Sequence, residues 1–213
     1  PQRDHTDFEA SAGYGSDDTY EISVAQGMFV LDDFGYYLTA TKRDTDGFRD
    51  NSDLDHKDVS LKLLYDKGDA LEISLYGDYI DREYGIPGVK PPKGTSDYFD
   101  NGLKVYNSDA ASLLDNGSDE DGHLVFSLKG NPMDCLDFSI IGDYSNMENY
   151  TYNRYVDLYD SGDLLGFESW VTNEVYGIET NVDLSPYDGL GVLLGFEYNE
   201  YEWENESVDL DAS

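Results

Sequence analysis

The sequence predicts an all-β fold, an antiparallel up-and-down meander of about nine strands, on three observations. Apolar and polar residues alternate with a period of two along much of the chain, as in a strand with one buried face. The 19 tyrosines and 21 glycines against 3 methionines favour strands over helices. Short turns and long polar loops separate the alternating segments. This pattern indicates strands that are joined at alternate ends of a sheet.

The strands follow from the alternation itself. The clearest pair lies within residues 34–88, where Val59, Leu61 and Leu63 share one face and a turn at 66–69 leads to the same pattern at Ile73 and Leu75. Strands are expected at residues 8–14, 20–28, 36–40, 59–65, 71–79, 124–128, 136–144, 176–184 and 190–200.

The connections between these strands are unequal. Those near residues 15–18, 31–33, 66–69, 130–134 and 185–189 are short, whereas long loops are expected near 43–58, 81–122 and 146–166. Consecutive connections of a meander lie at opposite ends of the sheet, so one end carries tight turns and the other carries the loops. This asymmetry is a feature of transmembrane β-barrels. The prediction is one β-barrel domain over residues 1–213, partial or completed by partner chains, because an odd strand count suits no closed bacterial barrel and an open sheet exposes two edges.

The face chemistry leaves an alternative open. A lipid-facing exterior with a polar lumen and a soluble sheet with one face on a core show the same alternation. Tyrosines near strand ends resemble an interfacial girdle, although tyrosine is also simply a good strand residue. They are Tyr14, Tyr36, Tyr37, Tyr65, Tyr79, Tyr144 and Tyr198.

Composition excludes several classes. A formal charge of −33 and a pI near 4.1 make nucleic acid a poor partner, since phosphate binding needs clustered Lys and Arg. The single cysteine, Cys135, gives no internal disulfide and no multi-cysteine metal site. We expect no signal peptide from the opening PQRDHTDF and no transmembrane helix, since no run of about 18 apolar residues occurs.

One stretch carries a resemblance to a known family. Residues 35–88 contain GYYLTATKRDTDGFRDNSDLDHKDVSLKLLYD and, after the next strand, DREYGIPG, and FEASAGYGSDDTYEISVAQG precedes them. In this order the strings resemble the early barrel strands of TonB-dependent outer-membrane receptors, in which a plug domain precedes a 22-stranded barrel. In these 213 residues we expect neither a plug domain nor a TonB box, and the final DLDAS lacks the terminal aromatic of the family. The resemblance implies the N-terminal part of a barrel in the cell outer membrane, in contact with lipid.

The same resemblance implies a function. Receptors of this type bind a small metal chelate such as a ferric siderophore or a cobalamin-like ligand, and a TonB-type complex energises its uptake. External loops and the lumen wall capture the ligand, so we expect arginines to meet its carboxylates and aromatic rings to stack on it. The candidates are Arg43, Arg49, Arg82, Tyr84, Tyr98, Tyr152 and Arg154. For each of them the alternative is that it only packs the loops together.

Catalytic and metal signals are weak. No nucleophile elbow, phosphate loop or HExxH occurs, and His5, His56 and His123 are scattered, with His56 expected in an exposed loop, so we predict no enzyme. Two acidic stretches resemble calcium loops without completing the pattern, and solvated loops are the favoured interpretation. If calcium binds, the expected ligands are Asp44, Asp46, Asp115, Asp119 and Asp121; no other cofactor is expected.

The sequence thus favours an outer-membrane receptor barrel. Two alternatives stay open. One is a structural or porin-like outer-membrane barrel that assembles with other chains, and the other is a soluble secreted β-sheet binding protein.

Overall fold

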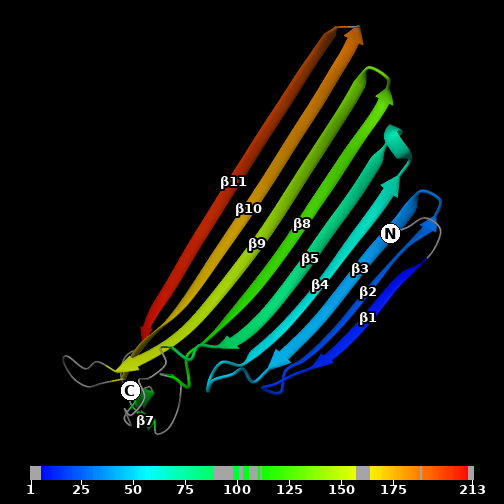
Figure 1. The fold of residues 1–213 in the computed structure, drawn as a ribbon. Coiled ribbons are helices and arrows are strands. Elements are labelled where there is room, and N and C mark those ends of the chain that lie inside the picture. Colours follow the sequence, from blue (N-terminus) through cyan, green and yellow to red (C-terminus); the bar gives the residue numbers. More distant parts are fainter. Residues whose placement is uncertain are drawn as a thin grey trace.

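The computed structural model describes residues 6–88, 98–100, 103–105, 110, 112–156, 164–187 and 189–210. Within them the chain forms one curved, nine-stranded antiparallel sheet in the order β1-β2-β3-β4-β5-β8-β9-β10-β11 (Figure 1), with a separate two-stranded hairpin, β6-β7. The strands are β1 (Asp7–Tyr14), β2 (Tyr20–Leu31), β3 (Phe34–Thr45), β4 (Leu54–Asp66), β5 (Glu72–Gly85), β6 (Tyr98–Asp100), β7 (Leu103–Val105), β8 (Asn116–Met133), β9 (Leu136–Val156), β10 (Leu164–Tyr187) and β11 (Leu190–Leu210). The predicted all-β meander is confirmed; a short 3₁₀ turn, η1 (Gly68–Ala70), is the helical element of the described residues.

The two ends of the sheet differ as predicted. Tight turns join β2 to β3, β4 to β5, β8 to β9 and β10 to β11 at one end, drawn at the top of Figure 1. β3, β5 and β9 end, and β4, β8 and β10 begin, at the other end, which we call the long-loop end. Gly68 and Gly189 have φ of 69° and 83°, the left-handed conformation that such tight turns require and that glycine adopts without strain.

The expected loop limits were too wide. The loop predicted at 43–58 is shorter, because β3 extends to Thr45 and β4 begins at Leu54. The loop predicted at 81–122 is also shorter, because β5 extends to Gly85 and β8 begins at Asn116. The loop set at 146–166 is largely strand, since β9 runs to Val156 and β10 starts at Leu164. These extensions are mostly polar and charged, so they carry too little hydrophobic alternation for a strand to be recognised.

The register separates two faces. Leu63, Leu75, Phe126, Gly142, Ile178 and Tyr198 form one row of directly paired residues across six strands, from β4 to β11. We call their side the aliphatic face. The neighbouring positions in the strands form the polar face, where Ser11 and Ser23 hydrogen-bond at 2.7 Å, as do Thr39 and Ser60.

The aliphatic face is itself divided along the strands. Near the tight turns it is apolar, for example at every second residue from Leu136 to Tyr144 on β9 and from Leu190 to Tyr198 on β11, a span of nine residues in each case. Tyrosines mark the end of this apolar band at Tyr79, Tyr144, Tyr176 and Tyr198. Carboxylates follow on the same face, at Asp81, Glu120, Glu148, Glu174 and Glu200, with Asn146 between Tyr144 and Glu148. Tyr144 and Tyr176 stack with ring centroids 4.9 Å apart.

The sheet has no hydrophobic core of its own. Among the described residues Ala110 is the one buried hydrophobic side chain, while Leu194 and Phe196 of the apolar band are 58% and 59% exposed. The accessible surface is 13785 Å², against roughly 9,900 Å² for a compact monomer of 23.9 kDa. Something outside these residues must therefore cover the apolar band. None of the helical segments described is long or apolar enough to cross a membrane.

Candidate functional site

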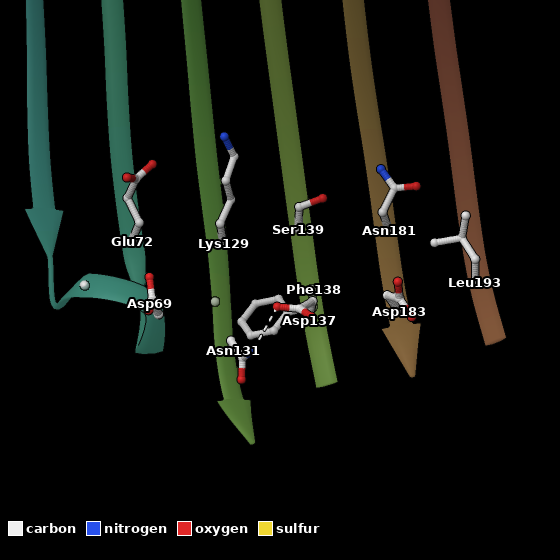
Figure 2. A pocket seen from close by; sticks show the side chains of 12 residues that line it. Asp69, Glu72, Lys129, Asn131, Asp137, Phe138, Ser139, Asn181, Asp183 and Leu193 are labelled. Atoms are coloured by element: carbon white, nitrogen blue, oxygen red, sulfur yellow. Dashed lines mark hydrogen bonds between the residues drawn. The ribbon is translucent and has the colours of Figure 1, made fainter. Parts of the chain in front are cut away.

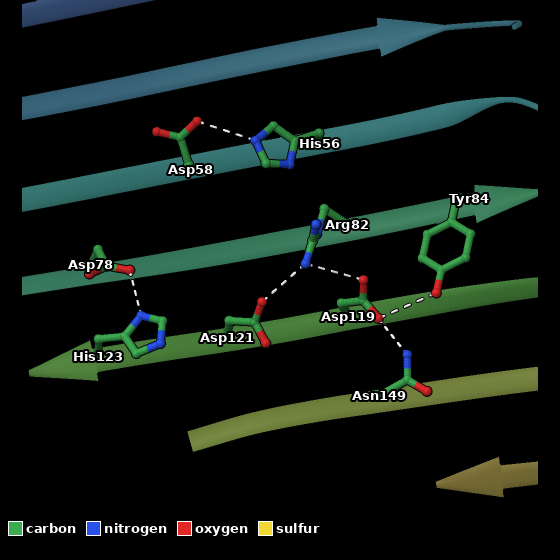
Figure 3. Close-up of polar contacts among 9 residues, drawn as sticks. All are labelled: His56, Asp58, Asp78, Arg82, Tyr84, Asp119, Asp121, His123 and Asn149. Carbon is green, nitrogen blue, oxygen red and sulfur yellow. Dashed lines mark hydrogen bonds and ion pairs between the residues drawn. The ribbon is translucent and has the colours of Figure 1, made fainter. Parts of the chain in front are cut away.

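The densest polar cluster lies on the polar face towards the long-loop end, on β5, β8 and β9 (Figure 3). Arg82 Nη2 lies 3.2 Å from Asp119 Oδ2 and 3.1 Å from Asp121 Oδ2, so one guanidinium bridges two carboxylates. Asp119 Oδ1 also accepts a hydrogen bond from the Asn149 amide and one of 3.3 Å from the Tyr84 hydroxyl. The two aspartates are 19% and 17% exposed, which strengthens these charge-assisted contacts relative to a surface pair.

Strand register explains why these residues meet. Arg43, His56, Arg82, Asp119 and Asn149 are directly paired in turn across β3, β4, β5, β8 and β9, and so form a single row on the polar face. Directly opposed side chains in a sheet lie about 5 Å apart at Cβ, within reach of ion pairs and hydrogen bonds. Two of the predicted arginines, Arg43 and Arg82, therefore share one row with a histidine between them.

Tyr84 reaches the cluster because its cross-strand partner is a glycine. A Cβ at Gly117 would lie 2.8 Å from the Tyr84 ring, so the ring occupies the space that a side chain on β8 would take. Burial, and then the charge of Asp119, raises the pKa of Tyr84 above its ordinary value. The phenol is thus held as a neutral donor that points at a carboxylate.

Two histidine–aspartate pairs flank the arginine. His123 Nδ1 lies 2.8 Å from Asp78 Oδ2 between β8 and β5, and His56 Nε2 lies 3.3 Å from Asp58 Oδ1 on β4 (Figure 3). The expectation of an exposed loop histidine at 56 was wrong, because β4 begins at Leu54 and the His56 side chain is 25% exposed. Sequence reasoning missed the His123–Asp78 pair, whose members are 45 residues apart.

The remaining predicted ligand-binding residues lie elsewhere. Arg49 belongs to the β3–β4 loop, where its Nη2 donates to the Gly88 carbonyl at 3.0 Å. Tyr152 and Arg154 occupy the aliphatic-face positions of β9, and Arg154 Nε donates to the Tyr152 hydroxyl at 3.0 Å. Tyr98 is in β6, in the separate hairpin. The seven candidates therefore do not form one site: Arg43, Arg82 and Tyr84 share the polar face, and the others do not join them there.

The acidic residues named for calcium are also dispersed. Asp119 and Asp121 are in β8 and pair with Arg82, Asp44 is in β3, and Asp46 and Asp115 are in connections. Asp115 is 7% exposed, and its Oδ1 accepts from the Arg154 backbone N–H at 2.8 Å. In the described part of the chain no three His, Cys, Asp or Glu side chains gather as a metal centre.

A hollow of about 460 Å³ lies at the opposite end, beside the tight turns (Figure 2). Its charged lining is Asp69, Glu72, Asp137 and Asp183 with Lys129, and Asn131 donates to Asp137 at 3.0 Å. The hollow carries an excess of negative charge and contains none of the predicted site residues. It is separated from the Arg82 cluster by much of the length of β5 and β8.

Together these features describe a curved, open sheet with one aliphatic and one polar face. Comparison with solved structures finds this fold. The ferric citrate transporter FecA in its unliganded form matches with a TM-score of 0.71 at 16% identity, over 96% of this chain and 29% of that one. The ferric-catecholate import receptor Fiu of E. coli K12, in its closed form, matches with a TM-score of 0.69 at 16% identity, over 93% of this chain and 32% of that one.

A third structure is similar, FpvA of P. aeruginosa bound to heterologous pyoverdines, with a TM-score of 0.66 at 13% identity over 97% of this chain and 29% of that one. These three proteins are TonB-dependent receptors, so the resemblance inferred from residues 35–88 is confirmed at the level of fold. The chain spans about a third of the length of the structures it matches. No family model and no curated protein matches the sequence.

Proposed function

We propose that this chain forms part of the wall of an outer-membrane β-barrel of the TonB-dependent receptor type, which binds a small metal chelate and takes it up without catalysing a reaction. The observation that carries the proposal is the fold shared with an iron transporter and import receptors over nearly the whole chain. The ligand class is a ferric siderophore or a cobalamin-like chelate, and a TonB-type complex supplies the energy.

The apolar band supports membrane insertion. Nine alternating positions from Leu136 to Tyr144 match the roughly 9–11 residues of a tilted transmembrane strand. The side chains of the band are exposed in the sheet, tyrosines lie at its edge, and carboxylates lie beyond them. This order matches the hydrocarbon core, the headgroup region and water of a membrane. The tight turns then face the periplasm and the long-loop end faces outwards.

The row Arg43–His56–Arg82–Asp119–Asn149 supports ligand binding. It lies on the polar face, which becomes the lumen wall, and towards the end by which a ligand enters. Arg82 already forms ion pairs with two aspartates, Asp119 and Asp121. A carboxylate of the chelate binds the Arg82 guanidinium by displacing one of these aspartates. Arg43 offers a second guanidinium in the same row.

Uptake tests the proposal directly. The complete reading frame is expressed in cells that lack their own iron receptors, and accumulation of radioactive iron is measured with ferric citrate and with a ferric catecholate, and of cobalamin in parallel. We expect one probe to accumulate only when the TonB-type complex is intact, and Arg82→Gln to reduce that uptake. Lys129→Gln, at the other end of the polar face, is the matched control and should leave uptake unchanged. Accumulation that ignores the energising complex would contradict the receptor proposal.

A second candidate, a porin-like barrel assembled from several chains, is favoured by one observation. Within the described residues β1 and β11 each pair with a single neighbour, so both sheet edges present unpaired backbone groups. Mass measurement of the purified barrel separates the two proposals, since a receptor barrel of one chain contains no second polypeptide.

A further inference from the structure

A second hollow lies on the aliphatic face beyond the tyrosine boundary, on β8, β9 and β10. Its volume is about 430 Å³. Its aliphatic-face lining is Ser118, Glu120, Glu148, Tyr150, Glu168, Trp170 and Thr172. We call it the aromatic–acidic groove. It faces away from the Arg82 row, and nothing in the proposed uptake function uses it.

Two aromatic rings form one wall of the groove. Tyr150 and Trp170 are directly paired across β9 and β10, and their ring centroids lie 5.3 Å apart at an interplanar angle of 40°. Trp170 is 39% exposed, so part of its surface stays open. The tilted pair offers electron-rich ring surfaces, and a cation over such a face is attracted by the ring quadrupole.

Three glutamates line the groove beside the rings: Glu120, Glu148 and Glu168. Glu120 and Glu148 are directly opposed across β8 and β9, an arrangement that is unfavourable for like charges. Asp81 opposes Glu120 on its other side and is itself paired with Lys57 at 3.3 Å. Glu120 accepts from the Tyr79 hydroxyl at 2.9 Å, and Glu148 accepts from the Asn146 amide at 3.1 Å. Both donors are neutral.

Glu168 completes the set. Glu168 also lines the groove and is directly opposed to Tyr152 across β9 and β10. Burial, and then the charge and hydrogen bond of Glu168, raises the pKa of Tyr150. No ion pair among the described residues involves Glu120, Glu148 or Glu168. The basic residue further along β9, Arg154, donates its Nε to Tyr152 instead. The groove therefore combines aromatic faces with uncompensated negative charge.

We propose that the aromatic–acidic groove binds a small organic ammonium ion. Aromatic faces next to carboxylates suit a cation that is both charged and apolar, such as a trimethylammonium group, because the rings take its methyl surface and the glutamates its charge. A bare metal ion fits poorly, since it gains little from ring faces and no three-carboxylate centre is formed in the described part of the chain.

Choline is the probe, and its neutral isostere, in which a tert-butyl group replaces the trimethylammonium group, is the control. The complete protein is titrated in detergent micelles at constant ionic strength, and tryptophan fluorescence and heat are recorded. We expect a saturable response to choline and none to the isostere. Trp170→Leu should abolish the fluorescence response and weaken binding by roughly five- to thirtyfold, whereas Trp203→Leu, at the chain's other tryptophan, should leave binding unchanged.

Variants of the glutamates test the proposal without changing the packing of the aromatic rings. Glu148→Gln and Glu168→Gln should each weaken choline binding by about threefold, because each removes one partly exposed charge. Glu202→Gln, on β11 outside the groove, should change nothing. Equal responses to choline and to its isostere would overturn the proposal, as would a loss in Glu202→Gln as large as that in Glu168→Gln.

Discussion

The two halves of the same strands obey different rules. Towards the tight turns, each strand alternates between an aliphatic and a polar side chain, and the sheet shows no core to cover the aliphatic ones. Towards the long loops, charged, polar and aromatic side chains replace the aliphatic ones, and the polar face carries paired charges such as Arg82–Asp119. If the chain forms the proposed outer-membrane barrel, this difference assigns one half of the same sheet to the bilayer and the other half to water.

The largest expected effect comes from placing a charge in the apolar half. Ile140 lies at the middle of the β9 band, so Ile140→Arg should destabilise the folded barrel in lipid by about 2–4 kcal/mol, the cost of an arginine at mid-bilayer. Urea unfolding in lipid vesicles measures it. The matched change in the other half, Glu202→Arg on β11, should cost almost nothing. An equal loss of stability for the two arginine variants would contradict the difference between the two halves of the strands.

Removing the central cation tests the polar half. Arg82→Gln leaves Asp119 and Asp121 facing each other without their shared partner, and should destabilise by about 1 kcal/mol. The value is at the low end because the Arg82 side chain is 38% exposed. The double variant Arg82→Gln with Asp119→Asn should recover part of this loss of stability. Unfolding curves of the single and double variants check this. A double variant less stable than Arg82→Gln alone would contradict the ion-pair explanation.

A smaller effect is expected at the glycine under Tyr84. Gly117→Ala places a Cβ 2.8 Å from the ring, so the ring must swing aside and release Asp119. We expect a loss of about 0.5–1 kcal/mol, because the phenol–carboxylate hydrogen bond that is lost is long, at 3.3 Å. In a Tyr84→Ala background the same substitution should cost much less, because no ring remains to be displaced. Additive costs would show that Gly117 serves another purpose.

The smallest effect concerns like charges. Glu174 and Glu202 are directly opposed across β10 and β11, so Glu202→Gln should stabilise by about 0.3 kcal/mol at low salt. The gain should fade at high ionic strength as screening shortens the reach of the repulsion. A gain that persists in high salt would point to a cause other than charge.

The same division explains what the sequence could predict. Val59, Leu61 and Leu63 on β4 and Ile73 and Leu75 on β5 alternate visibly, so their strands, the turn between them and their shared face were predicted correctly. Beyond the tyrosines, consecutive residues of a strand are mostly polar on both faces, so apolar and polar side chains no longer alternate there. NGSDEDGH at 116–123 therefore suggested a calcium-like loop, although it begins β8.

The candidate site followed the same pattern. Arg82 and Tyr84 were predicted as ligand contacts from residue type and family resemblance, but their partner Asp119 is 37 residues beyond Arg82 and was placed in a loop. Only the β5–β8 register, with Arg82 opposite Asp119, brings them together. Register across a long connection is set by the pairing of the whole hairpin, which no local pattern in 116–123 specifies.

Labelling of Cys135 tests the central claim most directly. This residue lies at the tight turn between β8 and β9, and Phe48, 78% exposed, lies in the β3–β4 loop at the other end. In intact cells that express the complete protein, a membrane-impermeant maleimide should leave Cys135 unlabelled until the outer membrane is permeabilised, with Cys135→Ser as the blank. In Cys135→Ser carrying Phe48→Cys, labelling should occur in intact cells. Labelling of Cys135 in intact cells, or recovery of the protein outside the membrane fraction, would contradict a sheet divided between lipid and water.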